Sequence, residues 1–282
     1  MVPMELDHKA VLSALPDRDP NGHKGSFGKL LLLCGSRGFT GAAYLAAMGA
    51  LRCGAGLVYL GVPESIYAIE ATKLNEPVVF PLPARDGMLS REAIAPILAK
   101  LPRMDAVLIG CGLGQREDTF AVTKAVLDTA QCPGVLDADG INLMAGHTDI
   151  LRGRRAPTIL TPHAGEFQRL GAVVGQDTLA AASQLALALG CIILLKGHRT
   201  VITDGMRTYR NPTGNPGMAV GGSGDVLAGM ITALLGQGLS PLEAAACGAW
   251  LHGKAGDLCA RELGQMAMLP TDMLSALPRL LK

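Results

Sequence analysis

The chain has 282 residues, of which 49% are hydrophobic and 17% are charged, and its formal net charge is +1. A chain of this length can bury a large core, and this composition argues against a disordered protein. The small net charge and the aromatic content of only 4% give no reason to expect binding to nucleic acid or to an anionic membrane.

The seven cysteines form no C-x-x-C pair and no spaced cluster, and most of them lie inside apolar runs. We therefore expect buried free thiols, as in a protein of the reducing cytoplasm. The first residues, MVPMELDHKAV, contain no cationic segment followed by an apolar core, and charged residues interrupt every long apolar run. The sequence thus predicts a cytoplasmic protein without a signal peptide or a membrane span.

Residues 1–28 predict a short helix at 10–15 and then a polar arm that packs on the surface of the domain. From there on, short apolar runs that predict buried strands alternate with segments of helical periodicity. Strands are expected at 29–34, 57–62, 78–80, 105–109, 135–136, 158–160 and 191–195, and a hairpin at 200–203 and 207–210. Helices are expected at 42–53, 90–101, 117–130, 179–189, 226–235, 240–261 and 272–281.

This alternation predicts an α/β fold with a mostly parallel central sheet that is covered by helices on both faces. Ser90 is expected to cap the helix that follows it, and the sequence S-P-L-E at residue 240 predicts a capping box with Pro241 in the first helical position. No linker, shift in composition or internal repeat divides the sequence. We expect residues 1–282 to form one domain.

The segment 211–236, NPTGNPGMAVGGSGDVLAGMITALLG, combines a loop rich in glycine and proline with a helix that is apolar along most of its face. Gly222, Ser223 and Gly224 lie at the junction, where free backbone N–H groups and the positive end of the helix dipole form an anion site. Asp225 occupies the first turn. Taken alone, glycine before a helix and an acid in its first turn are also ordinary helix-start chemistry.

Several glycine-rich or polar turns follow the expected strands: GSRGFTG, GCGLG, DADG, TPHAGE and KGHRT. Because the carboxyl ends of parallel strands meet at one edge of a sheet, these turns are predicted to form one composite site. Within them, His163 is either a helix cap or a ligand contact, and Lys196 is either an ordinary strand-end cation or part of the site. Asp137 and Asp139 form a turn or help to hold a hydrated cation.

The common phosphate and catalytic motifs are not present in this sequence. There is no G-x-x-x-x-G-K-[ST], GCGLGQ lacks the third glycine of G-x-G-x-x-G, and GGSGD differs from G-x-S-x-G. There is also no H-E-x-x-H, and the six histidines show no metal-ligand spacing. These tests disfavour a P-loop NTPase, a dinucleotide Rossmann domain, a serine hydrolase and a zinc protease.

Almost the whole chain resembles the ribokinase-like superfamily and, within it, the ADP-dependent NAD(P)H-hydrate dehydratases. The resemblance rests on HKGSFGKLLLLCGS, TGAAYLAAMGALRCGAGLV, GCGLG, VLDADGIN, ILTPHAGEF, LLKGHRTVI and NPTGNPGMAVGGSGDVLAGMI. It implies a three-layer αβα fold. It also implies dehydration of the S epimer of hydrated NADH or NADPH, driven by ADP with Mg²⁺ and releasing AMP and phosphate.

The resemblance also implies roles for individual residues. Asp225 is expected to be the general base that takes the proton of the substrate hydroxyl as this attacks the β-phosphate of ADP. The expected substrate contacts are Ala42, Gly112 or Gly114, His163 and Asp225. The expected nucleotide contacts are Lys196, Gly197, His198, Arg199, Thr200, Gly222, Ser223 and Gly224. The ligands of Mg²⁺ are not assigned, and the KGHRT turn varies within the family.

Many bacterial members of the family carry an N-terminal epimerase domain, for which the 28 residues before the first strand leave no room. The expectation is therefore a standalone dehydratase that depends on a separate epimerase and forms a homo-oligomer, such as a tetramer. Two other functions stay open. One is an ATP-dependent kinase of a vitamin-precursor alcohol, and the other is a nucleotide-sensing module, which would need the glycine loop but not Asp225.

Overall fold

The computed structural model describes residues 3–172 and 177–281. The strands are β1 (Met4–Glu5), β2 (Lys29–Leu33), β3 (Leu57–Pro63), β4 (Val78–Leu82), β5 (Ala84–Arg85), β6 (Met88–Leu89), β7 (Ala106–Ile109), β8 (Gly134–Leu136), β9 (Thr158–Leu160), β10 (Ile192–Leu195), β11 (Val201–Thr203) and β12 (Thr208–Arg210). The helices are α1 (His8–Ala14), α2 (Thr40–Arg52), α3 (Glu64–Lys73), α4 (Ile94–Leu98), α5 (Glu117–Thr129), α6 (Asp139–Asn142), α7 (Thr148–Gly153), α8 (Ala164–Arg169), α9 (Thr178–Leu189), α10 (Ser223–Gly236), α11 (Pro241–Leu263) and α12 (Pro270–Ala276).

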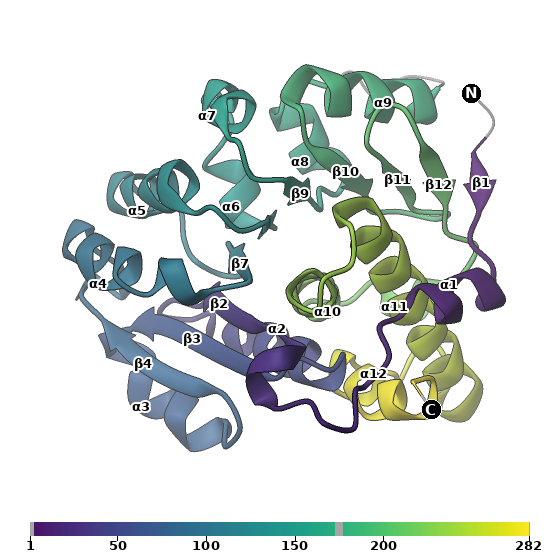
Figure 1. Cartoon of the computed structure of the whole chain (residues 1–282), viewed down its shortest axis with the longest axis horizontal. Coiled ribbons are helices and arrows are strands. Elements are labelled where there is room, and N and C mark those ends of the chain that lie inside the picture. The colour runs from purple at the N-terminus through teal and green to yellow at the C-terminus, as the bar shows by residue number, and fades with distance from the viewer. Residues whose placement is uncertain (1–2, 173–176, 282) are drawn as a thin grey trace.

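The centre of the molecule is a ten-stranded sheet in the order β1-β12-β11-β10-β9-β8-β7-β2-β3-β4 (Figure 1). Within the described residues, its strands pair in parallel except for β11, which is antiparallel to β10 and β12. β5 and β6 form a separate hairpin. The predicted mostly parallel sheet is confirmed, and so is the hairpin after β10.

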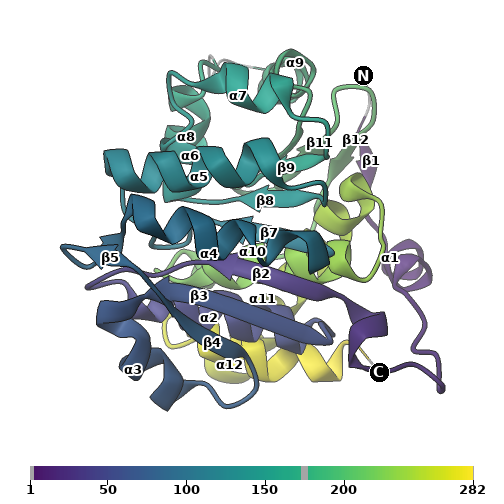
Figure 2. The same ribbon diagram turned by 60° about the vertical axis from the view of Figure 1, so that its left-hand side comes forward.

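Helices cover both faces of the sheet, as the two views in Figures 1 and 2 show. The alternation along β2 explains why: Leu30 and Leu32 join a core formed with α2, α3, α10, α11 and α12, whereas Leu31 and Leu33 join a core formed with α4 to α9. Successive side chains of a strand point to opposite faces, so a continuous apolar strand needs a helical layer on each side. The expected three-layer αβα fold is confirmed.

Helices α2 and α10 lie in unusually close contact on one face of the sheet. A Cβ atom added to Gly229 of α10 would lie 2.0 Å from the carbonyl oxygen of Ala46, and one added to Gly49 of α2 would lie 2.5 Å from that of Val226. Only glycine permits this approach. The contact fixes the first half of α10, which continues from GGSGD, against the second half of α2.

Some boundaries differ from the sequence prediction. The helix expected at 90–101 is replaced by a short 3₁₀ turn, α4 and a second 3₁₀ turn, because Pro96 and Pro102 interrupt the backbone hydrogen bonding of a longer helix. The DADG turn continues into α6, and α3 was not predicted. The capping box at Ser240 is also not formed, since its hydroxyl donates to the Glu243 carboxylate at 2.6 Å instead of capping α11.

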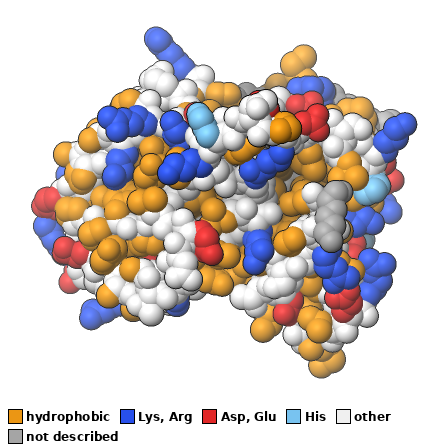
Figure 3. All heavy atoms as spheres, turned by 60° about the horizontal axis from the view of Figure 1, so that its bottom comes forward, with side chains coloured by type: hydrophobic (Ala, Val, Ile, Leu, Met, Phe, Trp, Pro, Cys, Tyr) orange, Lys and Arg blue, Asp and Glu red, His pale blue; other side chains and the backbone are white. Residues whose placement is uncertain are grey.

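The N-terminal arm contributes to the sheet, which the sequence did not predict. β1 pairs in parallel with β12, with Met4 opposite Tyr209. Farther along the arm, the guanidinium of Arg18 lies 4.2 Å from the centre of the Phe27 ring and donates to the carbonyl of Gly54. Among the described residues no helix is both long and apolar enough to cross a membrane. On the face shown in Figure 3, lysine and arginine side chains are dispersed among hydrophobic and acidic ones.

Candidate active site

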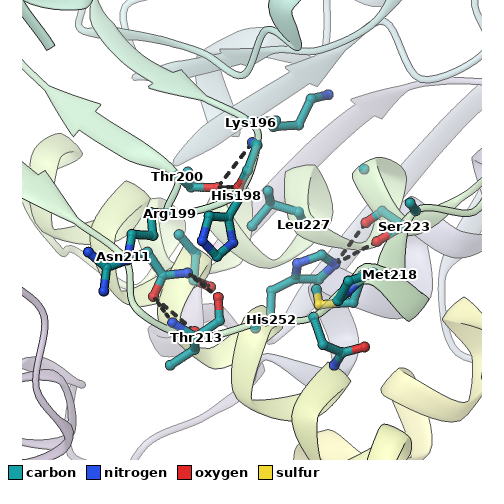
Figure 4. Close-up of a pocket in the computed structure, with 18 of the residues that line it drawn as sticks. Lys196, His198, Arg199, Thr200, Asn211, Thr213, Met218, Ser223, Leu227 and His252 are labelled. Carbon is teal, nitrogen blue, oxygen red and sulfur yellow. Dashed lines mark hydrogen bonds between the residues drawn. The ribbon is translucent and has the colours of Figure 1, made fainter. Parts of the chain in front are cut away.

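A cavity of about 750 Å³ opens beside the start of α10. This volume lies in the range of pockets that hold small-molecule ligands. We call it the α10 cavity; it is lined by His163, Lys196, Gly197, His198, Arg199, Thr200, Asn211, Pro212, Thr213, Gly214, Asn215, Pro216, Met218, Ala219, Val220, Ser223, Gly224, Leu227, Ala249, His252 and Gly253. Figure 4 shows Asn211 and Thr213 on one side of the cavity and Ser223 and His252 on the other.

The start of α10 has the backbone geometry of an anion site. Gly222 is the N-cap residue in the left-handed conformation, with φ of 97°, and no side chain caps the helix. The N–H of Ser223 donates to the carbonyl of Val220 at 3.3 Å, and the next two N–H groups of α10, those of Gly224 and Asp225, stay free for a ligand beside the cavity. Nothing lies within 4 Å of a Cβ position at Gly221, and at Gly224 the nearest atom is the Lys196 Nζ, at 3.3 Å.

The side chain of His252, on α11, forms a hydrogen bond with the start of α10. Its Nε2 lies 2.9 Å from the carbonyl oxygen of Ser223, so the ring donates its proton to that oxygen. Burial lowers the pKa of His252 to about 4, despite the opposing effect of this hydrogen bond. At neutral pH the ring is therefore uncharged, and one nitrogen is fixed as the donor.

Asp225 lies in the first turn of α10, beside a second carboxylate. The thiol of Cys111 and the carboxylates of Asp137 and Asp225 each offer a ligand atom within 4.8 Å of the others. Burial and, to a smaller extent, the nearby charge of Asp137 raise the pKa of Asp225 to about 6, against the opposing effects of Cys111 and Lys196. Asp225 is thus poised to exchange a proton near neutral pH, as a general base requires.

Lys196, at the end of β10, connects this carboxylate cluster to the α10 cavity. Its Nζ lies 2.7 Å from Asp137 Oδ1 and 3.9 Å from Glu166 Oε2. Burial alone would lower the pKa of Lys196, but the charges of Asp137 and Glu166 outweigh it and the pKa is raised. The ammonium therefore stays charged, next to the free N–H groups of α10. A cation and a helix start beside the same space are the groups that suit a phosphate.

The turn after Lys196 is stabilised by a hydrogen bond within it. The Thr200 hydroxyl donates to the carbonyl of Gly197 at 3.0 Å, and Arg199 adopts a positive φ of 56°. His198 and Arg199 are exposed and line the cavity. The structure thus brings Lys196, Gly197, His198, Arg199, Thr200, Ser223 and Gly224 to one cavity, and Gly222 is the residue that precedes them on α10.

His163 fits both of the interpretations that the sequence allowed. It caps α8, because its Nδ1 accepts from the N–H of Gly165 at 3.0 Å, and its Nε2 lies 3.3 Å from Glu166 Oε1. Half of its side chain, 52%, is nevertheless exposed, and it lines the α10 cavity. The cap fixes the orientation of a ring that a ligand can still reach.

Ala42 and Gly112 lie together at the start of α2, outside the α10 cavity. A Cβ atom added to Gly112 would lie 2.9 Å from the Cβ of Ala42. Farther along α2, Leu45 packs against Gly222, where an added Cβ would lie 2.4 Å from Leu45 Cδ1. Asp225 itself does not line the α10 cavity, but it follows Gly224, which does, and its carboxylate lies close to Cys111, the neighbour of Gly112.

Gly114 occupies a different place from Gly112. Its N–H donates to Asp139 Oδ2 at 2.8 Å, and an added Cβ would lie 2.5 Å from the sulfur of Met88. The side chain of Gln115 donates to the other oxygen of Asp139 at 2.7 Å. Asp139 thus anchors the GCGLG turn, and its oxygens are occupied by protein donors.

Four residues of the site were not predicted from the sequence: Cys111, Glu166, Asn211 and His252. His252 lies in the apolar run AWLHG of α11, which resembles an ordinary core helix. Asn211 holds the Gly/Pro loop by donating to the carbonyl of Ala249 at 3.0 Å. No local pattern identifies these roles, because Asp137 for Cys111, Lys196 for Glu166, Ala249 for Asn211 and Ser223 for His252 are all distant in the sequence. The nearest signal was the position of Cys111 in a turn that follows a strand.

The chain has well-defined relatives. It matches the family model of the NAD(P)H-hydrate dehydratases over residues 30–279. A protein of Moorella thermoacetica, named bifunctional NAD(P)H-hydrate repair enzyme, is 47% identical over 277 residues, which cover 96% of this chain and 52% of that protein. The chain spans about half the length of the curated relatives that it matches, 52% in each of three examples.

Solved structures agree with this match. A Bacillus subtilis structure, described as an ADP/ATP-dependent NAD(P)H-hydrate dehydratase co-crystallised with ATP/Mg²⁺, is 32% identical with a TM-score of 0.86 and covers 99% of this chain and 98% of that one. A hydroxyethylthiazole kinase of Pyrococcus horikoshii covers 96% of this chain and 93% of its own with a TM-score of 0.63, but at 18% identity it shares only the fold. The family model and the Bacillus subtilis structure both extend over nearly the whole chain, and the chain belongs to the NAD(P)H-hydrate dehydratase family, whose enzymes are hydro-lyases.

Proposed function

We propose that this chain restores NADH and NADPH by removing water from the S epimer of their hydrated forms, with ADP as the phosphate donor. The observation that carries the proposal is the position of Asp225, a carboxylate with a pKa of about 6. It follows two residues that line the α10 cavity and lies beside Cys111, the neighbour of Gly112. This arrangement suits a phosphate donor on one side of a general base and a hydroxyl-bearing substrate on the other.

In the first step Asp225 takes the proton of the hydroxyl on C6 of the hydrated ring. The hydroxyl oxygen bonds to the β-phosphorus of ADP, the bond from that phosphorus to the bridging oxygen breaks, and AMP leaves. The free N–H groups at the start of α10 and the ammonium of Lys196, 3.3 Å from the added Cβ position at Gly224, would stabilise the charge on the transferring group. Gly222 and Gly224 leave the phosphate unobstructed.

In the second step the carbon–oxygen bond at C6 breaks. The electron pair of the ring nitrogen drives out phosphate, a much better leaving group than hydroxide, and loss of a proton from C5 restores the dihydronicotinamide. Phosphorylation thus divides one difficult elimination into two easier steps. The α10 cavity would hold the adenosine of ADP between the β10–β11 turn, the loop from Asn211 and helix α11.

The residues beside Asp225 fit a bound Mg²⁺. Mg²⁺ prefers oxygen ligands and is commonly held by one or two carboxylates together with substrate phosphates. Asp137 Oδ1 is engaged by Lys196 and by Thr161, whereas Oδ2 accepts a long hydrogen bond from the Cys111 thiol at 3.6 Å, so Oδ2 would hold the ion in place of that thiol. Cys111 is unsuited, since its pKa is raised well above the usual thiol value and it stays protonated. A bound Mg²⁺ would neutralise charge on the phosphates of ADP.

The proposal is tested by incubating hydrated NADH with the protein, Mg²⁺ and either ADP or ATP, and following the return of NADH. We expect turnover with ADP and one AMP and one phosphate formed for each NADH. The Asp225→Asn variant should lose about 10²–10⁴-fold in kcat and keep its affinity for ADP. A stable phosphorylated product, or near-normal turnover by the variant, would contradict the proposal.

The choice of epimer and the partner activity belong to the same proposal. If the site accepts the S epimer alone, the R epimer should give no NADH until an epimerase activity is added. The relatives named bifunctional repair enzymes support such cooperation. We also propose a homo-oligomer, which analytical ultracentrifugation would detect; a purely monomeric species at micromolar concentration would contradict it.

A further inference from the structure

Phe39 is an exposed aromatic residue at the edge of the candidate active site. Its side chain is 60% exposed, in a protein with only 5 phenylalanines. Single exposed apolar residues are common on protein surfaces and need no explanation by themselves. The setting of Phe39 is different, because the turn that carries it is fastened to the residues around Asp225.

Several hydrogen bonds fix this turn. The buried hydroxyl of Ser36 donates to the carbonyl of Gly112 at 2.7 Å. The N–H of Gly35 donates to the carbonyl of Cys111 at 2.8 Å. The N–H of Phe39 donates to the carbonyl of Ser36 at 2.8 Å, which closes the turn immediately before α2. The backbone that presents Phe39 is therefore held to the strand end that carries Cys111, next to Asp225.

The Phe39 side chain starts at the surface of Ala42 and Gly112. A Cβ atom added to Gly112 would lie 2.8 Å from the Cβ of Phe39 and 2.9 Å from that of Ala42. No atom lies within 4 Å of the added Cβ positions at Gly38 and Gly41 on either side of Phe39 in the chain. The turn therefore has open space next to an exposed ring. A preformed aromatic surface of this kind loses little conformational entropy when a flat ligand packs on it.

We propose that Phe39 is a stacking platform for the nicotinamide ring of the dinucleotide, and that it positions this ring on the side of Asp225 opposite the α10 cavity. The proposal rests on the proposed function, which places the reacting ring on the side of Ala42 and Gly112. The conjugated part of the hydrated ring, from N1 through C2 and C3 to the carboxamide, is planar and can stack on an aromatic side chain, which leaves C6 free. The carbon that carries the hydroxyl can then face Asp225. Phe39 touches the substrate but moves no proton.

The experiment measures binding of reduced nicotinamide mononucleotide to the full chain, with saturating AMP present to fill the α10 cavity. Phe39→Ala should raise its dissociation constant about 5- to 100-fold, the range that corresponds to loss of one base–aromatic stack. Phe39→Trp should restore binding, since it keeps a flat aromatic face. The KM for hydrated NADH should rise in Phe39→Ala by a similar factor, with a smaller change in kcat.

Leu187→Ala is the matched control. Leu187 is also 60% exposed but lies on α9, packed beside Gly205, and its variant should bind as wild type does. ADP-ribose, which carries the adenine half alone, distinguishes the two rings of the dinucleotide and should bind equally to wild type and Phe39→Ala under the same conditions.

The proposal is overturned if Phe39→Ala binds reduced nicotinamide mononucleotide as wild type does. It is equally overturned if Phe39→Ala weakens the binding of ADP-ribose as much as, or more than, the binding of reduced nicotinamide mononucleotide. These outcomes are independent of the proposed function. A wild type that does not dehydrate hydrated NADH would refute that function, whereas an active wild type with an unaffected Phe39→Ala variant would refute only the role of Phe39.

Discussion

At the scale of single residues, Asp225 shows how the fold changes the chemistry of a common side chain. An acid in the first turn of a helix is normally stabilised as the anion by the helix dipole. Here, burial and the neighbouring Asp137 work against ionisation and raise the pKa of Asp225 from 3.8 to about 6. The sequence supplied the residue and its place in the helix. It did not supply this pKa, which depends on a carboxylate 88 positions earlier in the chain.

The raised pKa predicts the pH dependence of the reaction. A general base works only as the carboxylate, so kcat/KM should be constant above the pKa of Asp225 and fall about tenfold per pH unit below it. The fall in kcat/KM should therefore begin near pH 6, the raised pKa of Asp225, and not near the ordinary value of 3.8. The pH profile of kcat/KM for hydrated NADH measures this, with circular dichroism at each pH to show that the protein stays folded. A profile that stays flat from pH 7 to well below about 5 would contradict the role of Asp225 as base.

The role of His252 could not be predicted from the sequence. Its hydrogen bond to the carbonyl of Ser223 supports the turn that binds phosphate in the proposed mechanism, but it comes from a helix that begins after α10. The alternation of apolar residues in α11 indicates a buried helix and nothing more. A buried histidine that serves one carbonyl leaves no pattern in the sequence.

At the scale of secondary-structure elements, the strands were the most predictable part of the chain. The buried runs of β2, β7, β9 and β10 are apolar and end in glycine or polar turns, which are strong local signals. α3 was missed because its sequence, ESIYAIEATK, has only two buried residues, Ile66 and Glu70, and therefore little apolar periodicity. The boundaries at 90–103 were wrong because Pro96 and Pro102 cannot donate backbone hydrogen bonds, so one α-helix cannot run through the segment.

The contact between α2 and α10 gives a prediction for these elements. Gly229→Ala would place a methyl group 2.0 Å from the carbonyl oxygen of Ala46, so the helices must separate. We expect a loss of about 1–3 kcal/mol in the free energy of unfolding and a lower kcat, because the start of α10 moves with the helix. Denaturant unfolding and the turnover assay measure the two effects.

Gly153→Ala is the control for this prediction. Gly153 is also helical, in α7, but no atom lies within 4 Å of its added Cβ position. Replacing an uncrowded helical glycine by alanine should leave stability unchanged or raise it by less than about 1 kcal/mol. Equal stability of wild type and Gly229→Ala would show that the two helices are not held in close contact.

At the scale of the whole molecule, the sheet assembles the site from distant segments. The turns after β2, β7, β8, β9 and β10 lie at one edge because these strands are parallel, as the sequence predicted. Parallel strands predict that such turns meet, but not which atoms touch. The ion pair of Lys196 with Asp137 at 2.7 Å and the separation of the α10 cavity from the Ala42 surface emerged only from the packing. Site residues such as Gly222 were expected from family resemblance, and the packing shows how they are arranged.

The central claim is that the hydroxyl oxygen of the substrate attacks the β-phosphate of ADP before the bond between this oxygen and C6 breaks. A hydrated NADH that carries a heavy oxygen isotope in this hydroxyl tests the claim most directly, because the oxygen can be followed into the products by mass spectrometry. Phosphoryl transfer followed by elimination predicts that the label appears in inorganic phosphate, with none in AMP. Label recovered in water, with unlabelled phosphate, would show that the hydroxyl leaves without being phosphorylated and would contradict the account.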